Sequence, residues 1–243
     1  MAYTVKSFFE TLKPYVIQDM QESGILASLT AAQAKIESGY GNSKLTVQCN
    51  NLFGIKGSYN GQSGRYLTTE YYNGVAQKVY ANFRKYPSWQ ESIADHSSLF
   101  NRLARYKNLR GETDYIKACN NVQADGYATS PVYSTTLLTC INQYKLYEWD
   151  AEALNRPIQK QKVLKIADYY PTLKIGSTGE YVLSWQRFLN LSGYPCGDED
   201  GIFGKNTRLA VIEYQKNHPE CGKPDGIIGP KTWTSLNLKT KAA

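Results

Sequence analysis

The sequence predicts a mainly α-helical chain of the α+β class, with one small β-hairpin lobe and a compact three-helix unit at the C-terminal end. Three observations support this fold class. Apolar residues recur at helical spacing through most of residues 1–150, residues 65–83 alternate around an Asn-Gly pair, and an Asp-Gly motif occurs twice near the C-terminus. We therefore expect a first domain at 1–150, a linker at 151–170 and a second domain at 171–243.

The first two helices are predicted before residue 40. One covers 7–22 and should bend or restart at Pro14, because proline lacks the N–H that a helix interior needs. The other covers about 24–38 and should end at Gly39, since glycine adopts the left-handed backbone of a helix C-cap. The loop CNNLFGIKG at 49–57 follows, with an Asn pair and two glycines that permit left-handed backbone.

The clearest β signal lies at 65–83. A two-residue turn of type I′ at Asn73 and Gly74 would place Glu70 opposite Gln77 in an antiparallel hairpin. Glu70 is then an acidic residue inside a strand, where acids are depleted. An exposed face of a two-stranded ribbon is the alternative reading of this glutamate.

Three more helices complete the first domain. Ser88 opens one with a capping box, and its apolar stripe should reach Leu103. A second lies near 113–124. A third should begin with Ser130 as N-cap and Pro131 as the first helical residue.

The C-terminal part contains an internal repeat. The sequences DGIFG from Asp200 and DGIIG from Asp225 lie 25 residues apart, and each precedes a predicted helix start. Another helix with apolar residues at helical spacing covers 179–191. We expect a three-helix unit in which Trp185 and Trp233 belong to the core.

Charge and cysteine content exclude several classes of protein. The net charge of +7 is spread along the chain, which argues against a nucleic-acid-binding arm and favours mild attraction to an extended anionic surface. The five cysteines show no C-x-x-C spacing, which speaks against a zinc cluster, although Cys196 and Cys221 could pair. The chain has only two histidines, His96 and His218, which are few for the ligands of a zinc-dependent hydrolase or the base of a Cys-His hydrolase. We expect His96 to be structural.

The stretch AAQAKIESGYG at 31–41 contains the strongest catalytic candidate. Glu37 should lie in the last turn of a helix, where the helix dipole and the apolar neighbours Ile36 and Tyr40 oppose its ionisation. A carboxyl group that stays protonated near neutral pH is what a general acid requires. A surface glutamate at a frayed helix end is the alternative reading.

Two resemblances rest on these motifs. Residues 15–150 resemble the glucosaminidase family of peptidoglycan hydrolases, glycoside hydrolase family 73, through AQAKIESGYG, NNLFGIKG, the TTE of the hairpin, FRKY and GYATSPVY in that order. Residues 172–237 resemble the peptidoglycan-binding-domain-1 module through LKIGSTGEYV, WQRFL, DGIFG, NTRLAV and DGIIGPKTW. The first resemblance implies a lysozyme-like fold for the helical domain with its hairpin lobe.

The same resemblance implies three catalytic residues. Glu37 matches the general acid of the family, and Glu70 matches the hairpin glutamate that acts as base or nucleophile. The N-acetyl group of the substrate is an alternative nucleophile. Tyr127 matches the tyrosine expected near the cleaved linkage, with Tyr133 as the second claimant, and Ser130 stands where the family usually has aspartate.

Substrate-binding residues are also implied. Asn51, Phe53 and Gly54 line the sugar groove or, on the alternative reading, shape a buried loop, and Tyr40 and Tyr133 are counted with the substrate-binding group. No metal or cofactor is expected.

The resemblance as a whole implies an endo-β-N-acetylglucosaminidase that cleaves the β-1,4 bond between GlcNAc and MurNAc, as a monomer bound to peptidoglycan glycan strands. A muramidase, a lytic transglycosylase and a non-catalytic wall-binding protein are the alternatives. The N-terminal stretch MAYTVKSFFETLKPYV has no signal-peptide core, and no stretch reaches membrane-span length. We therefore expect synthesis in a host cytoplasm and action on the cell wall after release, as for a phage endolysin, with a bacterial autolysin second.

Overall fold

The computed structural model describes residues 2–72, 75–128, 130, 132–155 and 171–235, with the backbone alone at 70–72 and 75–76. By the contacts among its residues, the chain divides into two compact units. The first comprises Met1–Asn121 and Cys140–Lys160, and the second comprises Val122–Thr139 and Gln161–Ala243. Each unit is described by itself.

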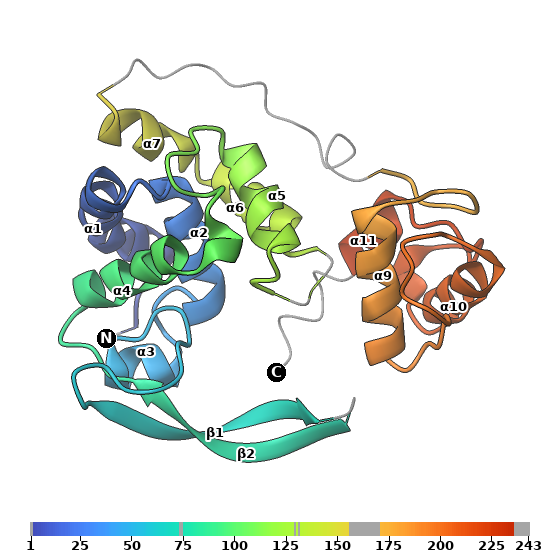
Figure 1. Cartoon of the computed structure of the whole chain (residues 1–243), viewed down its shortest axis with the longest axis horizontal. Coiled ribbons are helices and arrows are strands. Elements are labelled where there is room, and N and C mark those ends of the chain that lie inside the picture. The colour runs from blue at the N-terminus through green and yellow to red at the C-terminus, as the bar shows by residue number, and fades with distance from the viewer. Residues whose placement is uncertain (1, 73–74, 129, 131, 156–170, 236–243) are drawn as a thin grey trace. The chain divides into compact units, whose positions relative to one another are not determined.

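The first unit is helical with one hairpin, as predicted (Figure 1). Its elements are α1 (Val5–Ser23), α2 (Ala27–Ser38), α3 (Lys44–Cys49), β1 (Ser63–Tyr72), β2 (Val75–Arg84), α4 (Trp89–Arg102), the 3-10 turn η1 (Ala104–Tyr106) and α7 (Tyr147–Ala153). Helices α5 (Tyr115–Ala124) and α6 (Tyr133–Gln143) contribute residues to both units. Helix α1 packs against α2, α4 and α7, and fully buried Phe8, Leu12 and Val16 on α1 contribute to the core.

Helix α1 is one continuous element, so the predicted restart at Pro14 is wrong. A capping box between Thr4 and Ser7 begins the helix, and Gly24 in left-handed conformation ends it. The contacts of α1 with three other helices offset the hydrogen bond that proline removes from the helix interior.

The hairpin has the predicted register, with Tyr72 opposite Val75 and Glu70 opposite Gln77. The turn residues Asn73 and Gly74 lie outside the described part of the chain. Strands β1 and β2 form a two-stranded antiparallel sheet. The hairpin is joined to α3 by Tyr66, whose hydroxyl donates to Oε1 of Gln48 at 2.7 Å.

Two helix boundaries differ from the prediction. Leu103 follows the end of α4 and is exposed, so the buried stripe ends earlier, at Phe100. Helix α6 begins at Tyr133 because the chain first makes a turn in which the carbonyl of Ser130 accepts from the N–H of Tyr133 at 3.2 Å. Pro131 lies outside the described residues.

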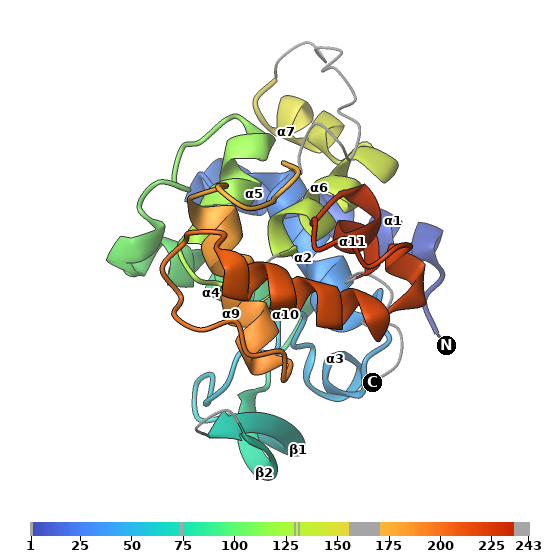
Figure 2. The same ribbon diagram turned by 90° about the vertical axis from the view of Figure 1, so that its right-hand side faces the viewer.

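The second unit contains the predicted three helices, α9 (Glu180–Leu191), α10 (Lys205–Lys216) and α11 (Pro230–Ser235), with a short 3-10 turn η2 (Pro219–Cys221) (Figure 2). Trp185 and Trp233 are fully buried with ring centroids 5.3 Å apart, which confirms their place in the core. Cys196 and Cys221 are free thiols, so the predicted disulfide option is not realised.

The repeat in this unit is structural as well as sequential. Gln186 on α9 donates to Oδ1 of Asp200 at 2.9 Å and accepts from the N–H of Gly201 at 2.8 Å. In the same way, Gln215 on α10 donates to Oδ1 of Asp225 at 3.2 Å and accepts from the N–H of Gly226 at 2.8 Å. Each helix therefore holds the DGIxG loop that follows it through one buried glutamine.

Among the described residues, no helix combines the length and the apolar character that crossing a membrane would require.

Candidate active site

Helix α2 ends in a turn that fixes the position of Glu37. Gly39, Tyr40 and Gly41 all have left-handed backbone, with φ of 58°, 58° and 75°. The N–H of Gly39 donates to the carbonyl of Lys35, as in the predicted glycine cap. The carboxyl group of Glu37 therefore leaves the helix from its last turn, at the negative end of the dipole.

The side chain of Glu37 is exposed in this structure. This exposure agrees with the alternative reading of Glu37 as a surface glutamate at the helix end. The raised pKa of Glu37 stays a prediction.

Gly41 shows how tightly the turn is packed. A Cβ atom at this position would lie 2.9 Å from Trp89 and 3.1 Å from Phe8, and its φ of 75° already disfavours other residues. The second glycine of the ESGYG stretch is therefore required by sterics, and the ring of Trp89 covers the turn.

Tyr40 adopts a conformation that costs a bulky residue on the order of 1–2 kcal/mol. Its hydroxyl lies 3.3 Å from the hydroxyl of Tyr144, and the ammonium of Lys35 lies 5.0 Å from the centre of its ring. These contacts hold the ring three residues beyond Glu37. Sugar binding by Tyr40 stays a prediction.

The other end of α2 is capped from a distant helix. Leu26 at the N-cap position has no side-chain acceptor for the helix, and Oδ1 of Asp150 on α7 accepts the N–H of Ser28 at 2.8 Å instead. Burial raises the pKa of Asp150 from 3.8 to about 7, while hydrogen bonds from Ser28 and Ala27 lower it. The helix that carries Glu37 is therefore held at both ends.

Replacing Asp150 with asparagine should change how stability depends on pH. The folded state holds the proton of Asp150 more tightly than the unfolded chain, so its contribution to the free energy of unfolding falls between pH 4 and 7. Asp150→Asn keeps the acceptor for Ser28 but cannot ionise. At pH 8 we expect the variant to be more stable than the wild type by roughly 1–3 kcal/mol, with little difference near pH 4. Thermal unfolding at pH 4, 6 and 8 measures this.

The control for that experiment is Glu152→Gln, which removes an exposed acid from the same helix. Asp19, whose pKa burial raises to about 6, remains in both variants and keeps part of the pH dependence. Parallel pH profiles for the Asp150 variant and the wild type would contradict the assignment.

The loop at 50–57 joins α3 to the base of the hairpin. Asn51 is buried, and its Nδ2 donates to the carbonyls of Ile55 and Arg84 at 2.9 and 2.8 Å. The left-handed backbone predicted for this loop is present at Asn50 and Gly54. These bonds support the loop-shaping reading of Asn51, and its contact with sugar stays a prediction, as does that of exposed Gly54.

Phe53 is buried against a histidine on α4. Its ring stacks on His96 with centroids 3.9 Å apart and an interplanar angle of 13°, and Phe100 lies on His96 from another side. Burial lowers the pKa of His96 to about 3, so this ring is neutral at physiological pH. The arrangement agrees with the structural function expected of His96, and sugar binding by Phe53 stays a prediction.

A polar clasp fixes the end of β2 against α4. Arg84 donates to Oδ1 of Asp95 at 2.7 Å, and the hydroxyl of Tyr86 donates to Oδ2 of the same carboxylate at 2.7 Å. Burial and the hydrogen bond to Asp95 raise the pKa of Tyr86, so it stays a donor. The hairpin base is therefore rigidly attached to the helices.

Three candidates remain, Glu70, Tyr127 and Tyr133. Glu70 occupies its predicted register position in β1, but its side chain is outside the described part of the structure. Tyr127 and Tyr133 belong to the second unit, where their rings stack 5.6 Å apart at 23°. The catalytic functions of Glu70 and Tyr127, and substrate binding by Tyr133, stay predictions.

Sequence reasoning missed the residues that support the site. Asp150 binds the N-terminus of α2 at Ser28, 122 residues away, and Tyr144 contacts Tyr40, 104 residues away. No local motif marks either position. Asp95 lies in the helix predicted after the FRKY motif, which contains Arg84. Their opposite charges were the only indication in the sequence that these two residues pair.

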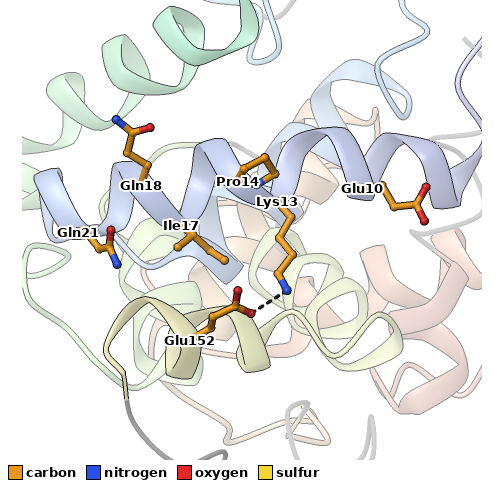
Figure 3. Close-up of a pocket in the computed structure, with 7 residues that line it drawn as sticks. All are labelled: Glu10, Lys13, Pro14, Ile17, Gln18, Gln21 and Glu152. Atoms are coloured by element: carbon orange, nitrogen blue, oxygen red, sulfur yellow. Dashed lines mark ion pairs between the residues drawn. The ribbon is translucent and has the colours of Figure 1, made fainter.

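A shallow groove on the outside of α1 is separate from this site (Figure 3). It has a volume of about 520 Å³ and is lined by Glu10, Lys13, Pro14, Ile17, Gln18, Gln21 and Glu152. An ion pair of 2.7 Å between Lys13 and Glu152 crosses it. None of the predicted site residues lines this groove.

The fold defines a helical domain with a hairpin lobe, together with a small three-helix module. The glucosaminidase family, described as mannosyl-glycoprotein endo-β-N-acetylglucosaminidase, matches residues 13–146, and a putative peptidoglycan binding domain matches residues 178–236. The chain belongs to the glucosaminidase family and carries a C-terminal domain of the peptidoglycan-binding type.

Relatives of known name agree with this family. The exo-glucosaminidase LytG of Bacillus subtilis is 36% identical over 148 residues, which are 59% of this chain and 52% of LytG. The chain thus spans about half the length of that relative. The catalytic domain of the autolysin Auto from Listeria monocytogenes has a TM-score of 0.57 at 32% identity, covering 61% of this chain and 90% of that domain.

A glycoside hydrolase domain of Salmonella typhimurium FlgJ, truncated at its C-terminus, is similar in fold as well. Its TM-score is 0.51 at 33% identity, covering 58% of this chain and 98% of that domain.

Proposed function

We propose that this chain is a peptidoglycan hydrolase that cleaves the β-1,4 bond between GlcNAc and MurNAc as an endo-β-N-acetylglucosaminidase. The observation that carries the proposal is the position of Glu37, held in the last turn of a helix that is fixed at both ends, within residues that match the glucosaminidase family. The names of the relatives, an exo-glucosaminidase and an autolysin, agree with this reaction class.

In the proposed mechanism, Glu37 protonates the glycosidic oxygen as the sugar leaves. This step needs a neutral carboxyl group, which the negative end of the α2 dipole favours and which bound substrate would favour further by excluding water. Glu70 on β1 acts as base or nucleophile from the other side of the sugar, or the N-acetyl group of the substrate takes that function. Tyr127 lies near the cleaved linkage in this proposal.

The second domain holds the enzyme on its substrate. We assign catalysis to 1–150, a linker to 151–170 and wall binding to 171–243, because the two family matches fall within the outer two ranges. The enzyme acts on the cell wall as a monomer, with peptidoglycan strands as its partner. The endolysin-like release route stays a prediction.

The products of digestion test the proposed bond. Purified peptidoglycan is digested with the full chain, and the fragments are reduced and identified by mass spectrometry. Reduced GlcNAc ends on fragments of several disaccharides are expected for an endo-glucosaminidase. MurNAc ends would show a muramidase, anhydro-MurNAc ends a lytic transglycosylase, and release of single sugars from chain ends an exo-enzyme.

A further inference from the structure

The hairpin has one row of side chains that the proposed reaction does not use. Residues of a strand alternate between faces, so Arg65, Leu67 and Thr69 share a face with their register partners Asn82, Tyr80 and Lys78. We call these six residues the outer face. Tyr66, on the opposite face, packs edge-on against Phe83 and bonds to α3. Figures 1 and 2 both show the hairpin extending away from the helices below α3.

The outer face is apolar in its middle. Leu67 and Tyr80 lie directly opposite each other and are 53% and 63% exposed. Side chains with this exposure bury little surface and therefore contribute little to the stability of the fold. A paired leucine and aromatic ring offers a flat surface of the kind on which the C–H face of a sugar ring can lie.

Basic residues flank this apolar pair. The guanidinium of Arg65 lies 5.0 Å from the centre of the Tyr80 ring, on one side of the pair. Lys78 is exposed on the other side, opposite Thr69. Four strand positions separate the pairs that contain these two cations, which corresponds to roughly 13 Å along the hairpin.

The residues around the outer face also have a net positive charge. Between residues 56 and 86 the chain has five basic side chains, Lys56, Arg65, Lys78, Arg84 and Lys85, and a single acidic residue, Glu70. Arg84 is paired with Asp95, and the excess of positive charge on this lobe still favours an anionic partner.

We propose that the outer face binds a second anionic glycan strand, a polysaccharide with pendant carboxylates, beside the strand that is cleaved. Tyr80 and Leu67 contact a sugar ring, while Arg65 and Lys78 bind carboxylates on either side of it. The inference rests on the proposed function because it assigns a second contact to the same polymer. It makes the hairpin a contact between neighbouring strands of the wall.

The first test locates the contact. The full chain with Glu37→Gln, labelled with ¹⁵N, is titrated with soluble uncrosslinked peptidoglycan strands at low salt. Amide signals of residues 65–69 and 78–82 are expected to shift with the bound fraction. Shifts confined to other parts of the chain would overturn the proposal.

The second test removes the charges. In the Glu37→Gln background, Arg65→Gln with Lys78→Gln should weaken the interaction reported by the outer-face amides about tenfold at low salt, with a smaller difference at high salt. The control pair Lys6→Gln with Lys107→Gln changes the net charge equally at exposed positions outside the hairpin strands, and its affinity should stay within about twofold of the parent chain. Equal weakening in both pairs would show a general charge effect and overturn the proposal.

The third test identifies the partner. Strands whose carboxylates have been amidated should perturb the outer-face amides about tenfold more weakly than unmodified strands. Equal binding by a neutral chitin oligosaccharide, or tighter binding by a phosphodiester polymer such as single-stranded DNA, would overturn the assignment of a carboxylated glycan. Glycan cleavage by the Glu37→Gln chain during titration would instead contradict the catalytic function of Glu37, so the two failures are distinguishable.

Discussion

Glu37→Gln is expected to lower the rate of peptidoglycan cleavage by about 10²–10⁴-fold while the protein stays folded. Glutamine has nearly the same shape and helix propensity as glutamate, and Glu37 is exposed, so α2 and its glycine cap should be unchanged. The loss comes from the missing proton on the leaving oxygen. Release of reducing sugar ends from purified walls measures it, and circular dichroism checks the fold.

A leaving-group comparison makes this test specific to acid catalysis. An aryl glycoside with an acidic phenol needs little protonation when its bond breaks, so the variant should lose much less activity on it than on glycan. Glu22→Gln, at an exposed position on α1, is the matched control and should retain wild-type rates. Lysis of walls by the Glu37 variant at the wild-type rate would disprove the catalytic assignment.

The second large effect is expected at Gln215 in the C-terminal domain. Gln215→Leu keeps the volume of the side chain but removes the donor to the carbonyl of Ile227 and the acceptor of the Gly226 N–H. A buried N–H without a partner costs about 1–3 kcal/mol, so we expect the domain to lose on the order of 3 kcal/mol of stability. Wall binding, measured by co-sedimentation, should fall with it.

The repeat provides an internal comparison for that variant. Gln186→Leu should give a loss of similar size, because Gln186 makes the equivalent bonds to the first loop. Glu213→Gln, which changes only an exposed ion pair with Lys216, should bind walls normally. If both glutamine variants unfold at the wild-type temperature, these hydrogen-bond sets do not hold the domain together.

Local chemistry explains why much of the fold could be predicted. The glycine cap at Gly39 and the register of Glu70 opposite Gln77 follow from residues close together in sequence. Likewise, the buried positions of Trp185 and Trp233 follow from helical periodicity and the repeat. In each case the pattern that decides the structure can be read from a short segment of the sequence.

Predictions failed where distant packing decides. Pro14 was expected to bend or restart the helix, and the restart is wrong because contacts with three neighbouring helices keep α1 continuous. The sequence left a surface position of Glu37 open only as an alternative, because its exposure depends on what the rest of the chain leaves uncovered. Asp150 could not be assigned to the N-terminus of α2, since its residue type says nothing about a partner 122 positions away.

The glutamine contacts of the C-terminal domain have a consequence for folding speed. Gln186 and Gln215 bind glycine N–H groups only 15 and 11 residues further along the chain. Closing such short loops costs little entropy, and proteins dominated by local contacts fold in microseconds to milliseconds. The helical domain must instead bring Asp150 back to Ser28 before α2 is capped. We therefore expect the C-terminal domain to refold first after denaturation and helix α2 to become ordered last.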